Sequence, residues 1–212
     1  MRYLFLPLIS AALFLSSCST AYYGAMEKVG VHKRDIMVSR VKKARASEQK
    51  AKEVFKDSLE EFSSVTGFKG GDLEKQYKRV NNAYLSAEKQ AADVKARHDD
   101  VERVSKALFR EWKKEIKLYE SAELKADSNK QLKAAQARYT NLINAMRRAE
   151  KSLDPVLRKF RDHSLYLKHN LNAKAIASLQ SQVKSTRIEV SRLIKEMEAA
   201  IAEADRFIKQ IE

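Results

Sequence analysis

Few residues of this chain have the types and spacing to do chemistry. His98 and His163 both occupy apolar positions of a helical repeat. Placed side by side, with Asp93, Asp99 or Asp162 nearby, they could bind a transition metal or form a pH-sensitive polar layer. The simpler interpretation is a hydrogen-bonded polar layer that sets the helix register, as single polar residues do in coiled coils. We therefore expect no metal site, and keep the His98/His163 pair as the lesser alternative.

Sequence patterns typical of enzymes do not occur. Gly70 and Gly71 precede a helix without the G-x-x-x-x-G-K-[ST] pattern of a phosphate-binding loop, and neither H-E-x-x-H nor G-x-S-x-G is present. Adjacent carboxylates such as Asp99 and Asp100 point about 100° apart on a helix and do not converge. We expect a protein that is not an enzyme and needs no cofactor.

The single cysteine stands at the end of an apparent export signal. After Met1-Arg2, residues 3–15 are apolar but too few to span a bilayer, which takes about 20 residues. The run LSSC that follows resembles the lipobox of bacterial lipoproteins. The resemblance implies cleavage between Ser17 and Cys18, a diacylglyceryl group on the Cys18 thiol, and an acyl chain such as palmitate on the new amine. Two or three acyl chains give stable anchoring where one chain is marginal.

Ser19 bears on the destination of the chain. In lipoproteins of Gram-negative bacteria, serine after the cysteine is usual for the outer membrane, and aspartate favours the inner one. The resemblance thus implies a protein held in the outer membrane and facing the periplasm. We expect residues 1–17 to be a lipoprotein signal peptide, residues 18–23 the lipidated cysteine and a short tether, and residues 24–212 one helical domain.

Heptad spacing over most of the chain predicts an all-α fold, an elongated antiparallel four-helix bundle of coiled-coil type. We expect helices near 24–65, 72–126, 129–170 and 173–211. The clearest apolar series lies in the expected helix 129–170: Leu132, Ala135, Tyr139, Leu142, Met146, Ala149, Leu153, Val156 and Phe160.

Turn residues set the expected boundaries of these helices. Asp72 is the expected N-cap of the second helix, and Asp127 or Ser128 that of the third. The second helix is longer than its partners, so it either overhangs them or breaks near 119–125. Pro155 falls within an unbroken heptad series, which favours one continuous, kinked helix over two.

Positive charge is concentrated on the third expected helix. The chain has a net charge of +14, and residues 129–170 carry 10 basic and only 3 acidic side chains. The outward heptad positions there form a row that we call the basic stripe: Lys130, Lys133, Arg147, Arg148, Lys151, Arg158, Arg161 and Lys168. A second group, the membrane-proximal cluster, lies near the anchored end: Lys33, Arg34, Arg40, Lys42, Lys43 and Arg45.

This charge pattern suggests an anionic partner. The export signal argues against nucleic acid and leaves peptidoglycan, anionic phospholipid or an acidic envelope protein. Each basic residue near an anionic membrane contributes about 1 kcal/mol, so the membrane-proximal cluster could hold that end of the rod against the leaflet. We expect a non-enzymatic periplasmic scaffold or adaptor. The alternatives are a docking module for another envelope protein, a metal- or ligand-binding bundle, and a basic surface that serves solubility alone.

Four segments resemble a family of uncharacterised proteobacterial lipoproteins, described as a domain of unknown function. These segments are YYGAMEKVGVHKRDIMVSRVKKA, GGDLEKQY, LINAMRRAEKSLDPVL and LYLKHNLNAKAIASLQ. The resemblance covers nearly the whole chain after Cys18. It implies a lipoprotein with a helical fold, and it implies no activity, substrate or catalytic residue.

Overall fold

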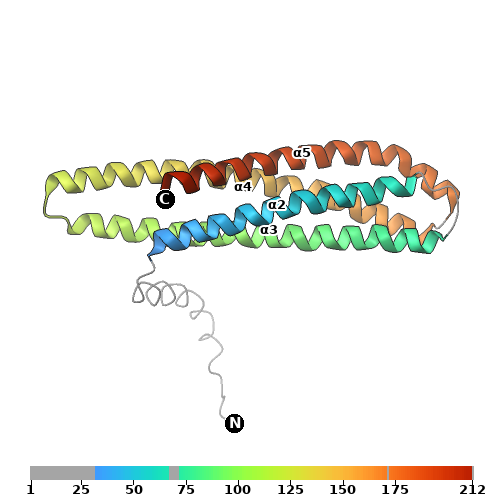
Figure 1. The fold of residues 1–212 in the computed structure, drawn as a ribbon, viewed down its shortest axis with the longest axis horizontal. Coiled ribbons are helices and arrows are strands. Elements are labelled where there is room, and N and C mark those ends of the chain that lie inside the picture. The colour runs from blue at the N-terminus through green and yellow to red at the C-terminus, as the bar shows by residue number, and fades with distance from the viewer. Residues whose placement is uncertain (1–31, 67–71, 171, 212) are drawn as a thin grey trace, which may run out of the picture.

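The computed structural model describes residues 32–66, 72–170 and 172–211. In these ranges α2 packs against α3 and α5, and α4 packs against the same two helices. Consecutive helices run antiparallel along one elongated bundle (Figure 1). The predicted all-α four-helix bundle is therefore confirmed. Its elements are α2 (Lys33–Thr66), α3 (Leu73–Glu115), the short 3-10 helix η1 (Ile116–Leu118), α4 (Ala122–His169) and α5 (Ala173–Ile211).

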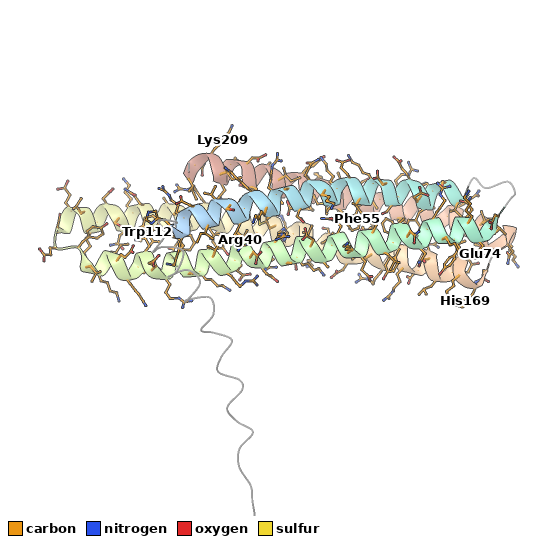
Figure 2. All side chains as sticks on the ribbon, turned by 60° about the horizontal axis from the view of Figure 1, so that its bottom comes forward. Arg40, Phe55, Glu74, Trp112, His169 and Lys209 are labelled. Atoms are coloured by element: carbon orange, nitrogen blue, oxygen red, sulfur yellow. The ribbon has the colours of Figure 1, made fainter. Side chains whose placement is uncertain are left out.

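The heptad positions of the four helices meet in one apolar core. An aromatic cluster lies within it: Phe160 of α4 stacks on Phe62 of α2, with ring centroids 4.4 Å apart, and its centroid is 6.0 Å from that of Phe55. Figure 2 places Phe55 along the middle part of the bundle. Burying one side chain of this size contributes about 1.5–3 kcal/mol, so this cluster is a main source of stability.

α3 begins where its sequence predicts. Asp72 has an extended backbone, and its side chain accepts a hydrogen bond from the backbone N–H of Lys75 at 3.1 Å. This bond satisfies one of the backbone donors that a helix start leaves free. Glu74 adds a negative charge in the first turn, where it complements the helix dipole.

α4 begins earlier than its sequence predicts. The N-cap is Ser121, whose hydroxyl accepts a hydrogen bond from the backbone N–H of Leu124 at 3.3 Å. The expected caps, Asp127 and Ser128, lie inside the helix instead. The chain turns directly after η1, within the range 119–125 that was the alternative expectation for the end of the second helix.

The polar run at residues 125–131 is helical, and its side chains form hydrogen bonds within α4 and to α3. Gln131 donates to Asp127 at 2.7 Å, one helical turn away. Ser128 is buried and accepts a hydrogen bond from the Trp112 indole N–H at 2.9 Å, which joins α3 to α4. Polar composition alone therefore gave the wrong place for the turn.

One end of the bundle has only two helices. α3 and α4 continue past the start of α2 and the end of α5 (Figure 1). Lys33, the first residue of α2, pairs with Glu111 of α3 at 2.6 Å, so α2 begins level with the last turns of α3. We call residues 113–130 the overhang, and residues 116–124 within it the hairpin tip. α3 thus ends at the earlier turn, and it overhangs α2 and α5 together with α4.

The remaining expectations concern the path of the chain. Pro155 lies inside α4, which continues through it as one helix, as predicted. Three expectations lie outside the described residues: the signal peptide at 1–17, the tether at 18–23 and the helix start at residue 24. Among the helices of residues 32–211 that are described, none is long and apolar enough to cross a membrane.

Candidate functional site

Arg147 of the basic stripe is held by carboxylates on two helices. Its guanidinium donates to Glu150 at 2.6 Å, to Asp99 of α3 at 2.9 Å, and to Glu102 of α3. Burial alone would lower the pKa of Arg147, but these hydrogen bonds outweigh that effect and raise it. Hydrogen bonds from Lys106 and Arg147 in turn lower the pKa of Glu102. Arg147 therefore joins α4 to α3, and its charge is neutralised within the bundle.

The rest of the basic stripe is exposed, with one further ion pair. Arg148 lies 3.4 Å from Glu196 of α5. In the described part of the chain, no ion pair joins the other six side chains to a carboxylate. We call these six the open stripe: Lys130, Lys133, Lys151, Arg158, Arg161 and Lys168.

The open stripe runs along the outer surface of α4. Arg147 and Asp154 contact α3, whereas Arg148 and Lys159 contact α5. The face between these two edges is solvent-exposed and carries the centre of the open stripe. From Lys130 to Lys168 it extends about 57 Å, at 1.5 Å per residue.

The membrane-proximal cluster is in large part structural. Arg34, Lys42 and Lys43 are exposed. The other three members form ion pairs with neighbouring helices: Lys33 with Glu111 at 2.6 Å, Arg40 with Asp100 at 3.4 Å, and Arg45 with Asp205 at 2.9 Å. The cluster occupies the first turns of α2, which runs along the length of the bundle. It therefore lies on the side of the rod, where Figure 2 shows Arg40, and not across the end of the rod.

His98 forms a polar layer with two carboxylates. Its Nε2 lies 2.8 Å from Glu48 of α2, and its Nδ1 lies 3.4 Å from Glu150 of α4. His98 and Glu48 are both 0 % exposed. As an imidazolium, His98 can donate from both ring nitrogens, and Arg147 neutralises Glu150 from the other side. We call Glu48, His98, Glu150 and Arg147 the polar layer.

Two members of the polar layer, Glu48 and Glu150, were not predicted from the sequence, and Glu48 is the fully buried one. Burial raises the pKa of Glu48 above its usual 4.5, while the hydrogen bond to His98 acts in the opposite direction. Its second oxygen has no hydrogen-bond partner among the described residues. The available signal was its heptad position, between Ala44 and Ala51 of the apolar series, where a carboxylate requires a buried partner.

The structure does not bring His98 and His163 together. His98 lies level with Glu150, and His163 is thirteen residues further along α4, about 20 Å away at 1.5 Å per residue. His163 instead packs edge-on against Phe62, at a centroid distance of 5.4 Å. Within residues 32–66, 72–170 and 172–211, no group of three metal-binding side chains is arranged to hold an ion.

His163 should make stability depend on pH. Burial lowers the pKa of His163 below its usual 6.5; nearby Asp162 opposes this effect and Lys159 adds to it. Because the unfolded chain binds the proton more readily, the fold loses stability as the pH falls from 6.5 through the lowered pKa. We expect His163→Gln to remove this part of the acid sensitivity.

Urea unfolding followed by circular dichroism at a series of pH values measures this dependence. The exposed His169 provides the matched control, since His169→Gln should leave the pH profile of the wild-type protein unchanged. An unchanged profile in His163→Gln would show that the acid sensitivity has another source.

A groove of about 400 Å³ lies at the base of the overhang, where α2 begins and α5 ends. Apolar side chains from all four helices form part of its lining, among them Met37, Phe109, Ala135 and Ile211. Arg34 and Arg138 line it together with Glu111 and Glu115, so the charges are balanced. The groove therefore has no preference for ligands of one charge.

Comparison with protein families matches residues 22–211 to DUF2959, which is described as a protein of unknown function. The chain belongs to this family. The DUF2959 match spans all four helices of the bundle, so the polar layer and the open stripe both lie within the family domain. Comparison with curated proteins and with solved structures gave no match. Ser17 and Cys18 lie outside both the matched range and the described residues.

Proposed function

We propose that this DUF2959 protein is a non-enzymatic outer-membrane lipoprotein, anchored through lipid on Cys18 and extending into the periplasm. It acts as a helical scaffold or adaptor whose open stripe binds an anionic envelope component, either peptidoglycan or phospholipid. The run LSSC and the apolar segment before it support the anchor. The rod-like bundle supports a role in spanning or spacing (Figure 1).

The observation that carries this proposal is that, among the described residues, no carboxylate forms an ion pair with the open stripe. Elsewhere on the bundle, basic side chains such as Arg45, Arg97 and Arg147 pair with acidic ones. A surface that served solubility alone would be expected to mix both signs. Along the open stripe, the outer face of α4 carries its six basic side chains against two exposed acidic ones, Asp154 and Asp162. This excess of positive charge attracts a polyanion, through contributions of about 1 kcal/mol per basic residue.

Reversing the charge of the open stripe should abolish binding to its target. We expect the triple variant Lys151→Glu, Arg158→Glu, Arg161→Glu to bind at least about 100-fold more weakly, since three contributions of about 1 kcal/mol are lost and repulsion is added. The measurement is cosedimentation of the chain that begins at Ser19 with purified sacculi and, separately, with anionic vesicles. Arg147 stays unchanged because its reversal would place a fourth carboxylate beside Asp99, Glu102 and Glu150.

α5 provides a matched control for this variant. Lys184, Arg187 and Lys195 are exposed as well, and their change to glutamate alters the net charge by the same amount. The control variant should still bind, because the open stripe is intact. Equal loss in both variants would show that net charge and not the open stripe causes binding, and equal retention would exclude the open stripe as the binding surface.

A second candidate function is docking on another envelope protein. The observation that favours it is an exposed apolar pair on α4, Leu165 at 51 % and Tyr166 at 39 % exposure, between Arg161 and Lys168. A docking surface of this kind would retain its partner at moderate salt, whereas binding through the open stripe alone weakens as salt screens the charges. Crosslinking in cells would then give one discrete adduct that Leu165→Asp removes.

A further inference from the structure

The hairpin tip exposes an unusual share of apolar surface. Leu118 is 79 % exposed, Leu124 is 58 % exposed and Tyr119 is 42 % exposed. These are three of the seven large apolar side chains that are exposed in the described part of the chain, and they fall within seven consecutive residues. A local apolar patch at the end of a rod is typical of a contact surface.

The overhang holds this patch in a fixed arrangement. Ile116 is buried between α3 and α4, and the Trp112 indole donates to buried Ser128 below the tip. The Ser121 cap fixes the start of α4. Leu118, Tyr119 and Leu124 are thus presented by a braced turn.

The hairpin tip lies at the end of the rod from which α2 begins (Figure 1). Cys18 precedes Lys33 by fifteen residues, which can span at most about 50 Å at 3.3–3.6 Å each. The first turns of α4, from Ala122 to Gln131, extend about 15 Å along the overhang at 1.5 Å per residue. A membrane that holds Cys18 is therefore within reach of the hairpin tip.

The charges around the tip are balanced. Residues 113–127 carry four basic side chains, Lys113, Lys114, Lys117 and Lys125, and four acidic ones, Glu115, Glu120, Glu123 and Asp127. A partner that is recognised by its charge would need an excess of one sign. Leucine and tyrosine beside lysine are instead the side chains that enter the interface between lipid headgroups and acyl chains.

We propose that the hairpin tip is a membrane foot, which inserts Leu118, Tyr119 and Leu124 into the lipid surface that holds the anchor. This inference rests on the proposed anchoring at Cys18. Three side chains bind a membrane weakly by themselves, but the anchor makes their contact intramolecular and raises the effective lipid concentration. The contact fixes the rod upright, so that the open stripe runs away from the membrane toward the cell wall.

In the test, the protein is attached to vesicles through Cys18, the position of the proposed anchor. The chain that begins at Cys18 keeps every contact of the described bundle, and its single cysteine can be coupled to a maleimide phospholipid. The vesicles are phosphatidylcholine with bromine on the acyl chains, which quenches only tryptophan that reaches the membrane. Tyr119→Trp in a Trp112→Phe background is the reporter, because Trp112 is the single tryptophan of the chain. Phenylalanine keeps an aromatic ring at position 112 and loses the hydrogen bond to Ser128, while buried Ile116 and the Ser121 cap still hold the tip.

We expect at least about a twofold loss of fluorescence from the Tyr119→Trp reporter on brominated vesicles relative to unbrominated ones. Adding Leu118→Glu and Leu124→Glu should abolish this loss. The matched control is Ile188→Trp in the same Trp112→Phe background, since Ile188 is exposed at 56 % on α5, away from the hairpin tip. It should show no quenching.

Two results would overturn the membrane foot. The first is an unquenched Tyr119→Trp reporter, or equal quenching of both reporters. The second is a loss of reporter fluorescence that depends on the density of protein on the vesicle and is the same without bromine. That result would identify a second copy of the chain as the occupant of the tip. Because the coupling is chemical and the lipid is neutral, neither result depends on cellular lipidation of Cys18 or on binding by the open stripe.

Discussion

Replacing His98 with leucine is expected to lower the free energy of unfolding by about 3–5 kcal/mol, because the change leaves a buried carboxylate without its partner. Glu48 is 0 % exposed and lies 2.8 Å from His98. Its second oxygen already lacks a hydrogen bond within the described residues. Urea unfolding followed by circular dichroism measures the loss, and His169→Leu at an exposed site should stay within about 0.5 kcal/mol of wild type.

The double variant His98→Leu, Glu48→Leu separates the cost of the orphaned carboxylate from the cost of altered packing. It removes both polar side chains of the buried pair, and Glu150 keeps its bond to Arg147 at 2.6 Å. We expect it to recover most of the stability that His98→Leu loses, since a buried ion pair and a well-packed apolar pair are often of similar stability. A double variant no more stable than the single one would show that packing, and not the orphaned carboxylate, determines the cost.

The same variant should respond to pH in a defined direction. A glutamate whose pKa is raised by folding contributes fully below its unfolded pKa of 4.5, and this contribution is lost as the pH rises through the raised value. Removing His98 takes away the interaction that holds the pKa of Glu48 down. The deficit of His98→Leu should therefore grow as the pH rises above 4.5.

Truncating Phe160 to alanine is the second change with a large expected effect. The ring is 0 % exposed and contacts Phe55 and Phe62 across the core. We expect a loss of about 3–5 kcal/mol, which combines the lost transfer free energy with the cost of the cavity. Chemical unfolding of Phe160→Ala beside the exposed-site control Leu165→Ala measures it. A loss below about 1 kcal/mol would show that α2 and α4 close the cavity by shifting together.

Heptad periodicity made the bundle predictable, because long amphipathic helices have few ways to bury their apolar faces. Turn residues predicted the N-cap at Asp72, and the unbroken heptad series predicted the passage of α4 through Pro155. Neither pattern could locate the turn at residues 119–121. That turn depends on the bond of Ser121 to the backbone of Leu124 and on the pairing of Trp112 with Ser128 across the hairpin.

The candidate site was predictable in its outline but not in its partners. Outward positions of a helix can be read from the repeat, so most of the basic stripe was found on the exposed face of α4. Which of these charges is neutralised depends on helices distant in sequence. Asp99 neutralises Arg147 from 48 positions away, and Asp205 neutralises Arg45 from 160 positions away. For the same reason Glu48, 50 positions from His98, was missed.

The polar layer lies between the helices of the bundle, whereas the open stripe lies on the outer surface of α4. Glu48, His98, Glu150 and Arg147 join α2, α3 and α4 at one level, which favours a single register of the helices. The open stripe lacks such internal partners in the described structure, and we propose that it is the part of the basic surface that binds a partner.

The salt dependence of binding tests the role of the open stripe most directly. The measurement is the dissociation constant of the chain from Ser19 on sacculi and on anionic vesicles, from low to physiological salt, for wild type and for Lys151→Glu, Arg158→Glu, Arg161→Glu. The account predicts tight wild-type binding to one of the two targets, weakening steeply with salt, and a nearly flat, weak curve for the variant. Parallel curves for the two proteins, or no binding to either target at physiological salt, would contradict it.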